Sequence, residues 1–184
     1  MTPKERYDAN LNHWTDMWDY SPWLLEHARG DILEIGVQNG VSTSAFLLGV
    51  ERNGGHLYSV DINPKCGALS MFEGHPDWTF ILSDSREREA VSAKLPPLLD
   101  ILFIDGNHSY PFVSSDLCYS DRVRPGGLVL MHDVAPEVSP ETTRGYGWEW
   151  GDPRRAYDEF VARTGWQAEI LPGKFGLGVI KRSL

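Results

Sequence analysis

One buried segment of the sequence ends in side chains suited to acid–base chemistry or to metal binding. Residues 100–112, DILFIDGNHSYPF, place four apolar residues ahead of Asp105, Asn107 and His108. An imidazole can accept a proton near neutral pH, and a carboxylate can orient that imidazole or bind a cation. Residues 126–133, GGLVLMHD, also end on a histidine and an aspartate. Both segments are therefore candidate parts of an active site.

Short apolar runs alternate along the chain with segments of helical character. The runs are residues 31–36, 56–61, 78–84, 99–105 and 126–133. The spacing is typical of parallel strands joined by crossover helices, and continuous apolar strands require helices on both faces of the sheet. Residues 152–164 are interpreted as a helix capped by Asp152 with Pro153 at its first position, and residues 166–171 and 174–182 as two closing strands. We predict an α/β fold whose sheet is mostly parallel and has a C-terminal antiparallel strand.

Length and composition favour a single domain over residues 1–184. With 41% hydrophobic residues the chain suits one compact unit, in which we expect an N-terminal helical cap at 1–30, with one helix over 7–27, and an active-site loop at 134–151. A net charge of −9 argues against nucleic-acid partners, which usually require a basic patch. Neither a signal peptide nor a membrane span is evident. We therefore expect a cytoplasmic protein without membrane partners, and a homo-oligomer is compatible with the sequence.

Acidic residues lie within or at the end of all five runs. They are Glu34, Asp61, Asp84, Asp105 and Asp133. Open α/β sheets bind ligands at the carboxyl ends of their strands, although an acid at such a position can also cap the next helix. Because five acids share this position, we predict that the carboxyl edge of the sheet forms the active site.

The segment after the first run has the features of a cofactor-binding loop. Gly36 and Gly40 allow a tight turn, and the helix that starts near Ser42 offers free N–H groups to an anion. Asp61, at the end of the second run, can accept the hydroxyls of a ribose. Gln38 stands where a dinucleotide fingerprint needs its second glycine, which disfavours NAD and FAD. A cofactor with a ribose and an amino acid tail but no pyrophosphate is S-adenosylmethionine (SAM).

From residue 31 onward the sequence resembles the class I SAM-dependent methyltransferases, which have a Rossmann-like doubly wound sheet. The stretches LEIGVQNG, YSVDINP and FILSDSRE are similar to the first three motifs of that family. The resemblance implies that Glu34 and Gly36 line the methionine end of SAM and that Asp61 binds the ribose. It also implies that Asp84 and Ser85 contact the adenine.

The stretches FIDGNHSYPFVSSDL and RPGGLVLMHDV resemble a more specific branch, the cephalosporin-hydroxylase-like and macrolide-sugar O-methyltransferases. In that branch a divalent metal lies between these strand ends, which implies a metal site at Asp105, His132 and Asp133. Relatives tend to have two acids where this chain has His132 and Asp133. Because imidazole favours transition metals, we expect manganese, iron or zinc to bind at least as well as magnesium.

Methyl transfer to a hydroxyl requires that the acceptor lose its proton. The imidazole of His108 could serve as general base for a phenol, whereas an alkyl or sugar hydroxyl needs a metal to lower its pKa. A rival interpretation makes His108 the sole base, with Asp105 orienting it or the methyl group. The catalytic candidates are therefore Asp105 and His108 in either case.

Aromatic residues outside the predicted strands are candidates for the substrate pocket. The loop ETTRGYGWEWGD contains Tyr146, Trp148 and Trp150 between glycines and is interpreted as a lid. A second set in the N-terminal segment could form another wall, pack on the sheet, or form a dimer interface. This set comprises Trp14, Trp18 and Trp23.

The leading functional hypothesis is an O-methyltransferase that acts on a small-molecule hydroxyl, phenolic or in a sugar-containing metabolite. The alternatives are a catalytically silent SAM-binding or interaction protein and, less favoured because of Gln38, a nicotinamide-dependent oxidoreductase. Cys66 and Cys118 are too few for a disulfide framework. We expect both to be reduced and structural, as buried free cysteines usually are.

Overall fold

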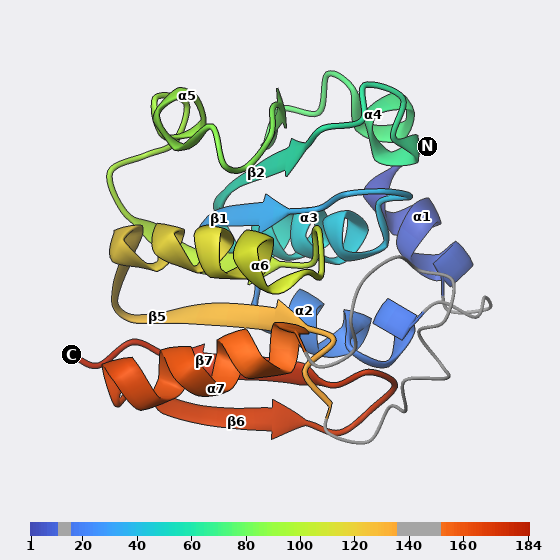
Figure 1. The fold of residues 1–184 in the computed structure, drawn as a ribbon. Helices are drawn as coiled ribbons and strands as arrows, with labels where there is room; N and C mark the ends of the chain where they lie inside the picture. The colour runs from blue at the N-terminus through green and yellow to red at the C-terminus, as the bar shows by residue number, and fades with distance from the viewer. Residues whose placement is uncertain (11–15, 136–151) are drawn as a thin grey trace.

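The computed structural model describes residues 1–10, 16–135 and 152–184, and these residues build a seven-stranded sheet (Figure 1). The strand order is β3-β2-β1-β4-β5-β7-β6. Neighbouring strands are parallel except at β7, which is antiparallel to both β5 and β6. The strands are β1 (Gly30–Ile35), β2 (Gly55–Asp61), β3 (Trp78–Leu82), β4 (Leu99–Ile104), β5 (Val123–His132), β6 (Gln167–Leu171) and β7 (Leu177–Lys181). The predicted Rossmann-like, mostly parallel sheet with a C-terminal antiparallel strand is confirmed.

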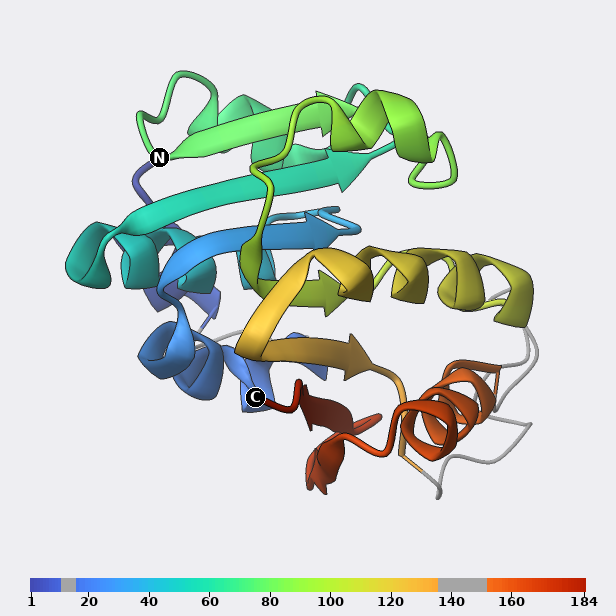
Figure 2. The same cartoon turned by 90° about the vertical axis from the view of Figure 1, so that its left-hand side faces the viewer.

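Helices cover both faces of this sheet (Figure 2). One face carries α1 (Pro3–Asn10), η1 (Asp16–Asp19), α2 (Ser21–His27), α3 (Val41–Asn53) and α4 (Gly67–Phe72). The other carries α5 (Arg88–Ser92), α6 (Tyr110–Asp116), η2 (Leu117–Arg122) and α7 (Asp152–Thr164). Strand β4 shows why both faces are needed, since Phe103 packs in one apolar core and Leu102 in the other.

The N-terminal segment differs from the single helix predicted over residues 7–27. Helix α1 is described over Pro3–Asn10, residues 11–15 lie outside the described part of the chain, and a short 3₁₀ helix, η1, precedes a separate α2. Pro22 lies at the start of α2, where its missing N–H costs nothing; inside a continuous helix it would remove a backbone hydrogen bond and clash with the preceding turn. The prediction was therefore wrong in continuity, because Pro22 requires a helix start at this point.

Two smaller expectations also change. Helix α7 spans Asp152–Thr164, so Asp152 is its first residue rather than the cap that precedes it. Cys66 is buried, but Cys118 is exposed on η2, so the expectation of a buried structural thiol was wrong for Cys118. None of the helices in the described ranges is long and apolar enough to cross a membrane.

Candidate active site

Two adjoining hollows lie at the carboxyl edge of the sheet and share Gly36, Gln38 and Asp105 in their walls. The first is further lined by Met17, Val37, Asn39, Val41, Ser42, His108, His132 and Asp133. The second is further lined by Ile35, Val60, Asp61, Ile62, Ser83, Ser85, Gly106 and Asn107. The predicted strand ends thus meet around one divided cavity, with Asp105 between its two parts.

The loop between β1 and α3 approaches the backbone after β4 very closely. Gly36 has a φ of +90°, and a Cβ at this position would lie 2.2 Å from the carbonyl oxygen of Asp105. Gln38 also has a positive φ, +41°, which is uncommon for a residue with a side chain. Only glycine can occupy position 36 without moving the loop or the segment that carries Asp105.

Asp61 anchors this loop from the end of β2. Its Oδ2 accepts hydrogen bonds from the N–H groups of Val37 at 3.0 Å and Gln38 at 3.2 Å, and its Oδ1 accepts one from Asn63 at 2.8 Å. A carboxylate has about four lone-pair sites, so Asp61 retains acceptor capacity toward the second hollow. Its position fits the predicted ribose contact and adds a role in ordering the loop.

Glu34 lies beneath the loop, and neither hollow includes it among the lining residues described. Its side chain is buried and accepts hydrogen bonds from the hydroxyls of Ser42, Thr43 and Ser59. Burial raises the pKa of Glu34 to about 7, and the three hydroxyls oppose that rise. Glu34 therefore supports the start of α3 from below. Ser42, unlike Glu34, lines the first hollow.

The two predicted adenine contacts occupy different places. Ser85 lines the second hollow. Asp84 instead binds Arg86, whose Nη2 lies 2.6 Å from Oδ2, and this hydrogen bonding lowers the pKa of Asp84. The Arg86 guanidinium also lies 4.0 Å from the centre of the Phe112 ring. Asp84 is thus engaged beside the hollow.

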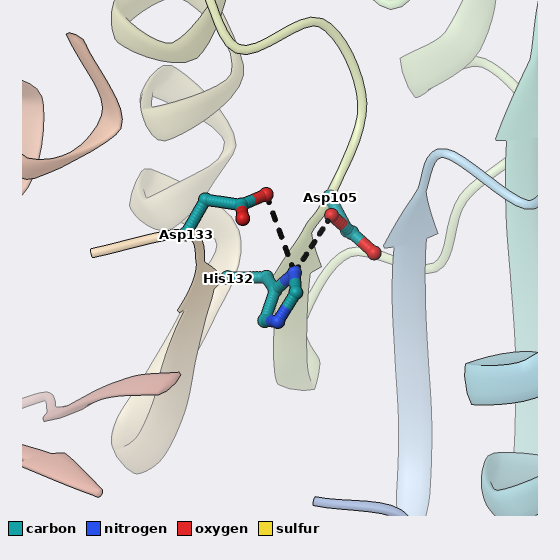
Figure 3. A group of neighbouring side chains, drawn as sticks. All are labelled: Asp105, His132 and Asp133. Atoms are coloured by element: carbon teal, nitrogen blue, oxygen red, sulfur yellow. Dashed lines mark hydrogen bonds and ion pairs between the residues drawn. The ribbon is translucent and has the colours of Figure 1, made fainter. Parts of the chain in front are cut away.

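Four side chains at the ends of β4 and β5 form an acid–imidazole cluster, which consists of Asp105, His108, His132 and Asp133. His132 Nδ1 lies 3.3 Å from both Asp105 Oδ1 and Asp133 Oδ2, as Figure 3 shows. His108 Nε2 lies 3.4 Å from Asp105 Oδ1 and 3.0 Å from Asp133 Oδ2. Each imidazole therefore contacts both carboxylates.

A left-handed residue makes this cluster possible. Successive residues of a regular strand point to opposite faces of the sheet, so His132 and Asp133 could not both reach one site from a continuous β5. The strand ends at His132, and Asp133 takes a φ of +61°. Asp tolerates this conformation better than most residues, and the turn brings its carboxylate back to the imidazoles.

Opposite charges dominate the electrostatics of the cluster. Burial favours the neutral form of Asp105, yet the charge of His132 and the hydrogen bonds from both imidazoles hold the pKa of Asp105 below its ordinary value. Burial also favours neutral His132 and His108, but the two carboxylates raise the pKa of His108 and raise that of His132 further. The protein alone therefore favours two imidazolium–carboxylate pairs.

The donor set fits a divalent metal. One ligand atom from each of Asp105, His132 and Asp133 lies within 4.8 Å of the others. The 3.3 Å separations from His132 Nδ1 to the two carboxylate oxygens are close to the roughly 3 Å edge of an octahedron with bonds of about 2.1 Å.

The predicted aromatic walls are only partly described. Tyr146, Trp148, Trp150 and Trp14 lie outside the described residues. Trp18 is half-buried, and Trp23 packs on the core and stacks on His27 at 3.8 Å between ring centres, so for Trp23 the packing alternative fits. Met17 is the residue of the N-terminal segment found in the first hollow. The contacts of Tyr20 and Phe175 with His132 had no signal in the sequence pattern.

Comparison with known proteins defines the class. The family model described as "Methyltransferase domain" matches residues 33–134, more than half of the chain. The chain therefore belongs to the methyltransferase domain family, and the class inferred from the sequence, a class I SAM-dependent methyltransferase, is confirmed. No curated protein sequence matches the chain.

Solved structures share the fold at low sequence identity. The SAH-bound methyltransferase PaMTH1 of Podospora anserina is 20% identical with a TM-score of 0.68, over 99% of this chain and 87% of that one. A putative caffeoyl-CoA O-methyltransferase of Staphylococcus aureus is 16% identical with a TM-score of 0.71, over 98% and 90%. MycE of the mycinamycin biosynthetic pathway, in complex with Mg, SAH and mycinamycin VI, is 17% identical with a TM-score of 0.68, over 100% and 55%.

Proposed function

We propose that the protein transfers the methyl group of SAM to a hydroxyl of a small molecule, phenolic or sugar-containing, with assistance from a divalent metal. The observation that carries the proposal is the position of Asp105, which lies in the walls of both hollows beside His108. SAM would extend from the second hollow toward the first, so that its methyl group and an acceptor in the first hollow would meet at the acid–imidazole cluster. The O-methyltransferase titles and the Mg-bound MycE among the fold relatives support this assignment.

The second hollow suits the nucleoside of SAM. In our proposal Asp61 accepts hydrogen bonds from the ribose, and Ser85 lies at the adenine end. Gly36 and Ser42 lie toward the methionine, because both line the first hollow near the start of α3, where free N–H groups favour a carboxylate. Gly40 shapes the helix start through its left-handed conformation at φ +68°.

His108 is the proposed general base. Its side chain is partly exposed, lines the first hollow, and contacts Asp105 and Asp133, which hold the ring toward the acceptor. Asp105, His132 and Asp133 would hold the metal, which when bound lowers the pKa of a coordinated oxygen. A bound cation also stabilises the neutral imidazoles electrostatically, which would free His108 to take a proton.

The test is a screen of phenolic and sugar hydroxyl acceptors with SAM, with methylated product and SAH measured by mass spectrometry. We expect product with at least one class, a loss of rate of about 10² to 10⁴ in His108→Ala as for a general base, and restoration by manganese after chelation. SAM binding without methylation of any acceptor would favour a silent SAM-binding protein. Full activity of chelated protein, verified metal-free by elemental analysis, would leave His108 as sole base.

NAD serves as the matched ligand control. Calorimetric titration should show SAM binding and no NAD binding, because Gln38 and the anchored loop provide no glycine-lined approach for a pyrophosphate. Binding of NAD without binding of SAM would favour a nicotinamide-dependent oxidoreductase over a methyltransferase.

A further inference from the structure

The imidazole of His132 is fixed by polar contacts on one edge only. Nδ1 faces the two carboxylates, while Nε2 lies on the opposite edge of the ring (Figure 3). Nε2 is buried and has no hydrogen-bond partner among the described residues. A histidine that binds a metal usually donates its second N–H to a carboxylate, a carbonyl or a water, and this bond sets the orientation of the ring. Among the described residues, it is the packing around the ring that can set this orientation.

Two aromatic rings meet the His132 ring edge-on. The ring centre of Tyr20 lies 5.6 Å away at an interplanar angle of 72°. The ring centre of Phe175 lies 6.4 Å away at 82°. Both residues lie outside the stretch that the family model matches, residues 33–134. The contacts are therefore contributed by the N-terminal segment and by the turn between β6 and β7.

The Tyr20 ring is held at both ends. Its backbone starts α2, and its buried phenol donates a hydrogen bond to the Lys174 carbonyl at 3.1 Å. The absence of a side chain at Gly173 makes this possible, since a Cβ there would lie 2.6 Å from the Tyr20 hydroxyl oxygen. Asp19 adds a second link, because its Oδ2 accepts the N–H of Lys174 at 2.9 Å.

Phe175 reaches His132 from a left-handed backbone conformation with a φ of +65°. Its carbonyl accepts the N–H of Ala135 at 2.7 Å. The turn at residues 173–176 is thus fastened on one side to Asp19 and Tyr20 and on the other to the segment that follows Asp133. A non-glycine residue in this conformation persists where the surrounding structure holds it, often at a functional site.

We propose that Tyr20 and Phe175 form an aromatic clamp that positions the His132 imidazole, so that Nδ1 rather than Nε2 is presented to a metal beside Asp105 and Asp133. The clamp rests on the proposed function, because it concerns the proposed metal site. Tyr20 and Phe175 are positioning residues in this scheme: they act through His132. The two edge-on ring contacts are the observation on which the clamp rests.

The experiment compares Tyr20→Leu, which removes the ring, with Tyr20→Phe, which keeps the ring and loses only the hydroxyl. Calorimetry with Mn²⁺ alone should show about tenfold weaker binding in Tyr20→Leu and near-wild-type binding in Tyr20→Phe. SAM affinity should stay within about twofold in both. Trp23→Leu, which removes an aromatic ring from α2 that stacks on His27 rather than on His132, is the matched control and should bind Mn²⁺ normally.

A nitrogen-specific readout separates positioning from general stability. In Zn²⁺-loaded protein, nitrogen-15 correlation spectra of the imidazoles should show His132 ligated through Nδ1 in the wild type and a mixture of ring orientations in Tyr20→Leu. Phe175→Gly provides a second variant should Tyr20→Leu fail to fold, because glycine accepts the positive φ readily. It should weaken Mn²⁺ binding and produce the same spectral heterogeneity.

His132→Ala distinguishes the two proposals. If it weakens Mn²⁺ binding while Tyr20→Leu and Phe175→Gly bind the metal as wild type does, the clamp is refuted and the metal site stands. If His132→Ala binds Mn²⁺ with unchanged affinity, His132 is not a ligand, and both the proposed ligand set and the clamp are overturned.

Discussion

At the residue scale, Asp61 and Asp84 can be compared directly: Asp61 ends β2, Asp84 lies just after the neighbouring β3, and both were predicted to contact SAM. Asp61 orders the loop through Val37 and Gln38 and lines the second hollow. Asp84 is already paired with Arg86. The sequence predicted both acids but could not show which one a nearby arginine would engage, because that depends on how the chain turns after β3.

The pair gives a direct test. Asp61→Ala should weaken SAM binding at least tenfold, since a hydrogen bond to a charged group contributes about 1.5–3 kcal/mol and the loop also loses its anchor. Asp84→Ala should weaken it much less. Calorimetry on folded variants measures both, and equal affinity losses would show that Asp84 leaves Arg86 when SAM binds.

Asp116 is a buried acid that lies away from the cluster. Its side chain is 1% exposed, and its Oδ1 has no hydrogen-bond partner among the described residues. Burial raises the pKa of Asp116 to about 6, against a hydrogen bond from Ser85 that lowers it. An acid whose pKa is raised on folding binds its proton more tightly in the native state. Its contribution to stability is therefore present below about pH 4 and is lost as pH rises through 6.

Asp116→Asn should remove this loss. In the wild type, ionisation of Asp116 lowers the free energy of unfolding by up to about 3 kcal/mol at pH 8, from roughly two pKa units at 1.36 kcal/mol each. The amide variant should therefore be more stable than the wild type at pH 8 and similar to it at pH 4. Urea unfolding at both pH values measures the difference. A variant that is destabilised more at pH 8 than at pH 4 would mean that the carboxylate makes a favourable contact when charged.

At the element scale, the loop between β1 and α3 shows what a pattern of glycines can predict. The sequence indicated a tight turn at Gly36 and Gly40, and both residues have positive φ. The support of α3 by buried Glu34 was not predicted, because a carboxylate at the end of a strand gives no sign of whether it faces the ligand or the core. The break before α2 is similar: Pro22 was visible, but the helical pattern on either side was treated as continuous.

Gly36→Ala tests the close approach of loop and strand end. A left-handed alanine is strained by about 1–3 kcal/mol, and at Gly36 the new Cβ also meets the Asp105 carbonyl. Gly54 offers a matched control, with a φ of +79° and no heavy atom within 4 Å of the place that a Cβ would take. Both variants should lose stability in urea unfolding, but only Gly36→Ala should lose SAM binding. Equal SAM affinities in the two variants would show that the loop between β1 and α3 can shift to accommodate the new Cβ.

The lid remains a prediction from the sequence, since residues 136–151 lie outside the described part of the chain. Replacing Trp148 and Trp150 together by alanine should raise the KM for the acceptor and leave SAM affinity nearly intact, because this loop follows β5 rather than the cofactor loop. Steady-state kinetics and calorimetry measure the two quantities. Equal losses for both ligands would contradict that division.

At the scale of the whole molecule, the sheet was predictable because strand burial leaves a continuous apolar signature. Of the five acids at the strand ends, Asp61, Asp105 and Asp133 line the two hollows, whereas Glu34 is buried beneath the loop and Asp84 is paired with Arg86. The clamp was not predictable, because Tyr20 and Phe175 are separated by most of the chain and only tertiary packing brings them together. Local periodicity carries no information about such contacts.

The place of β7 between β5 and β6 has a consequence for biosynthesis. A ribosome produces β6 before β7, so β6 has no strand beside it in the sheet until β7 has emerged. During that interval the outer edge of β5 presents unpaired backbone groups to other nascent chains, the template from which aggregates grow. The pairing of β7 with β5 also brings Phe175 to His132. The polypeptide therefore covers the open edge of β5 and completes the surroundings of the proposed metal ligand in the same folding step.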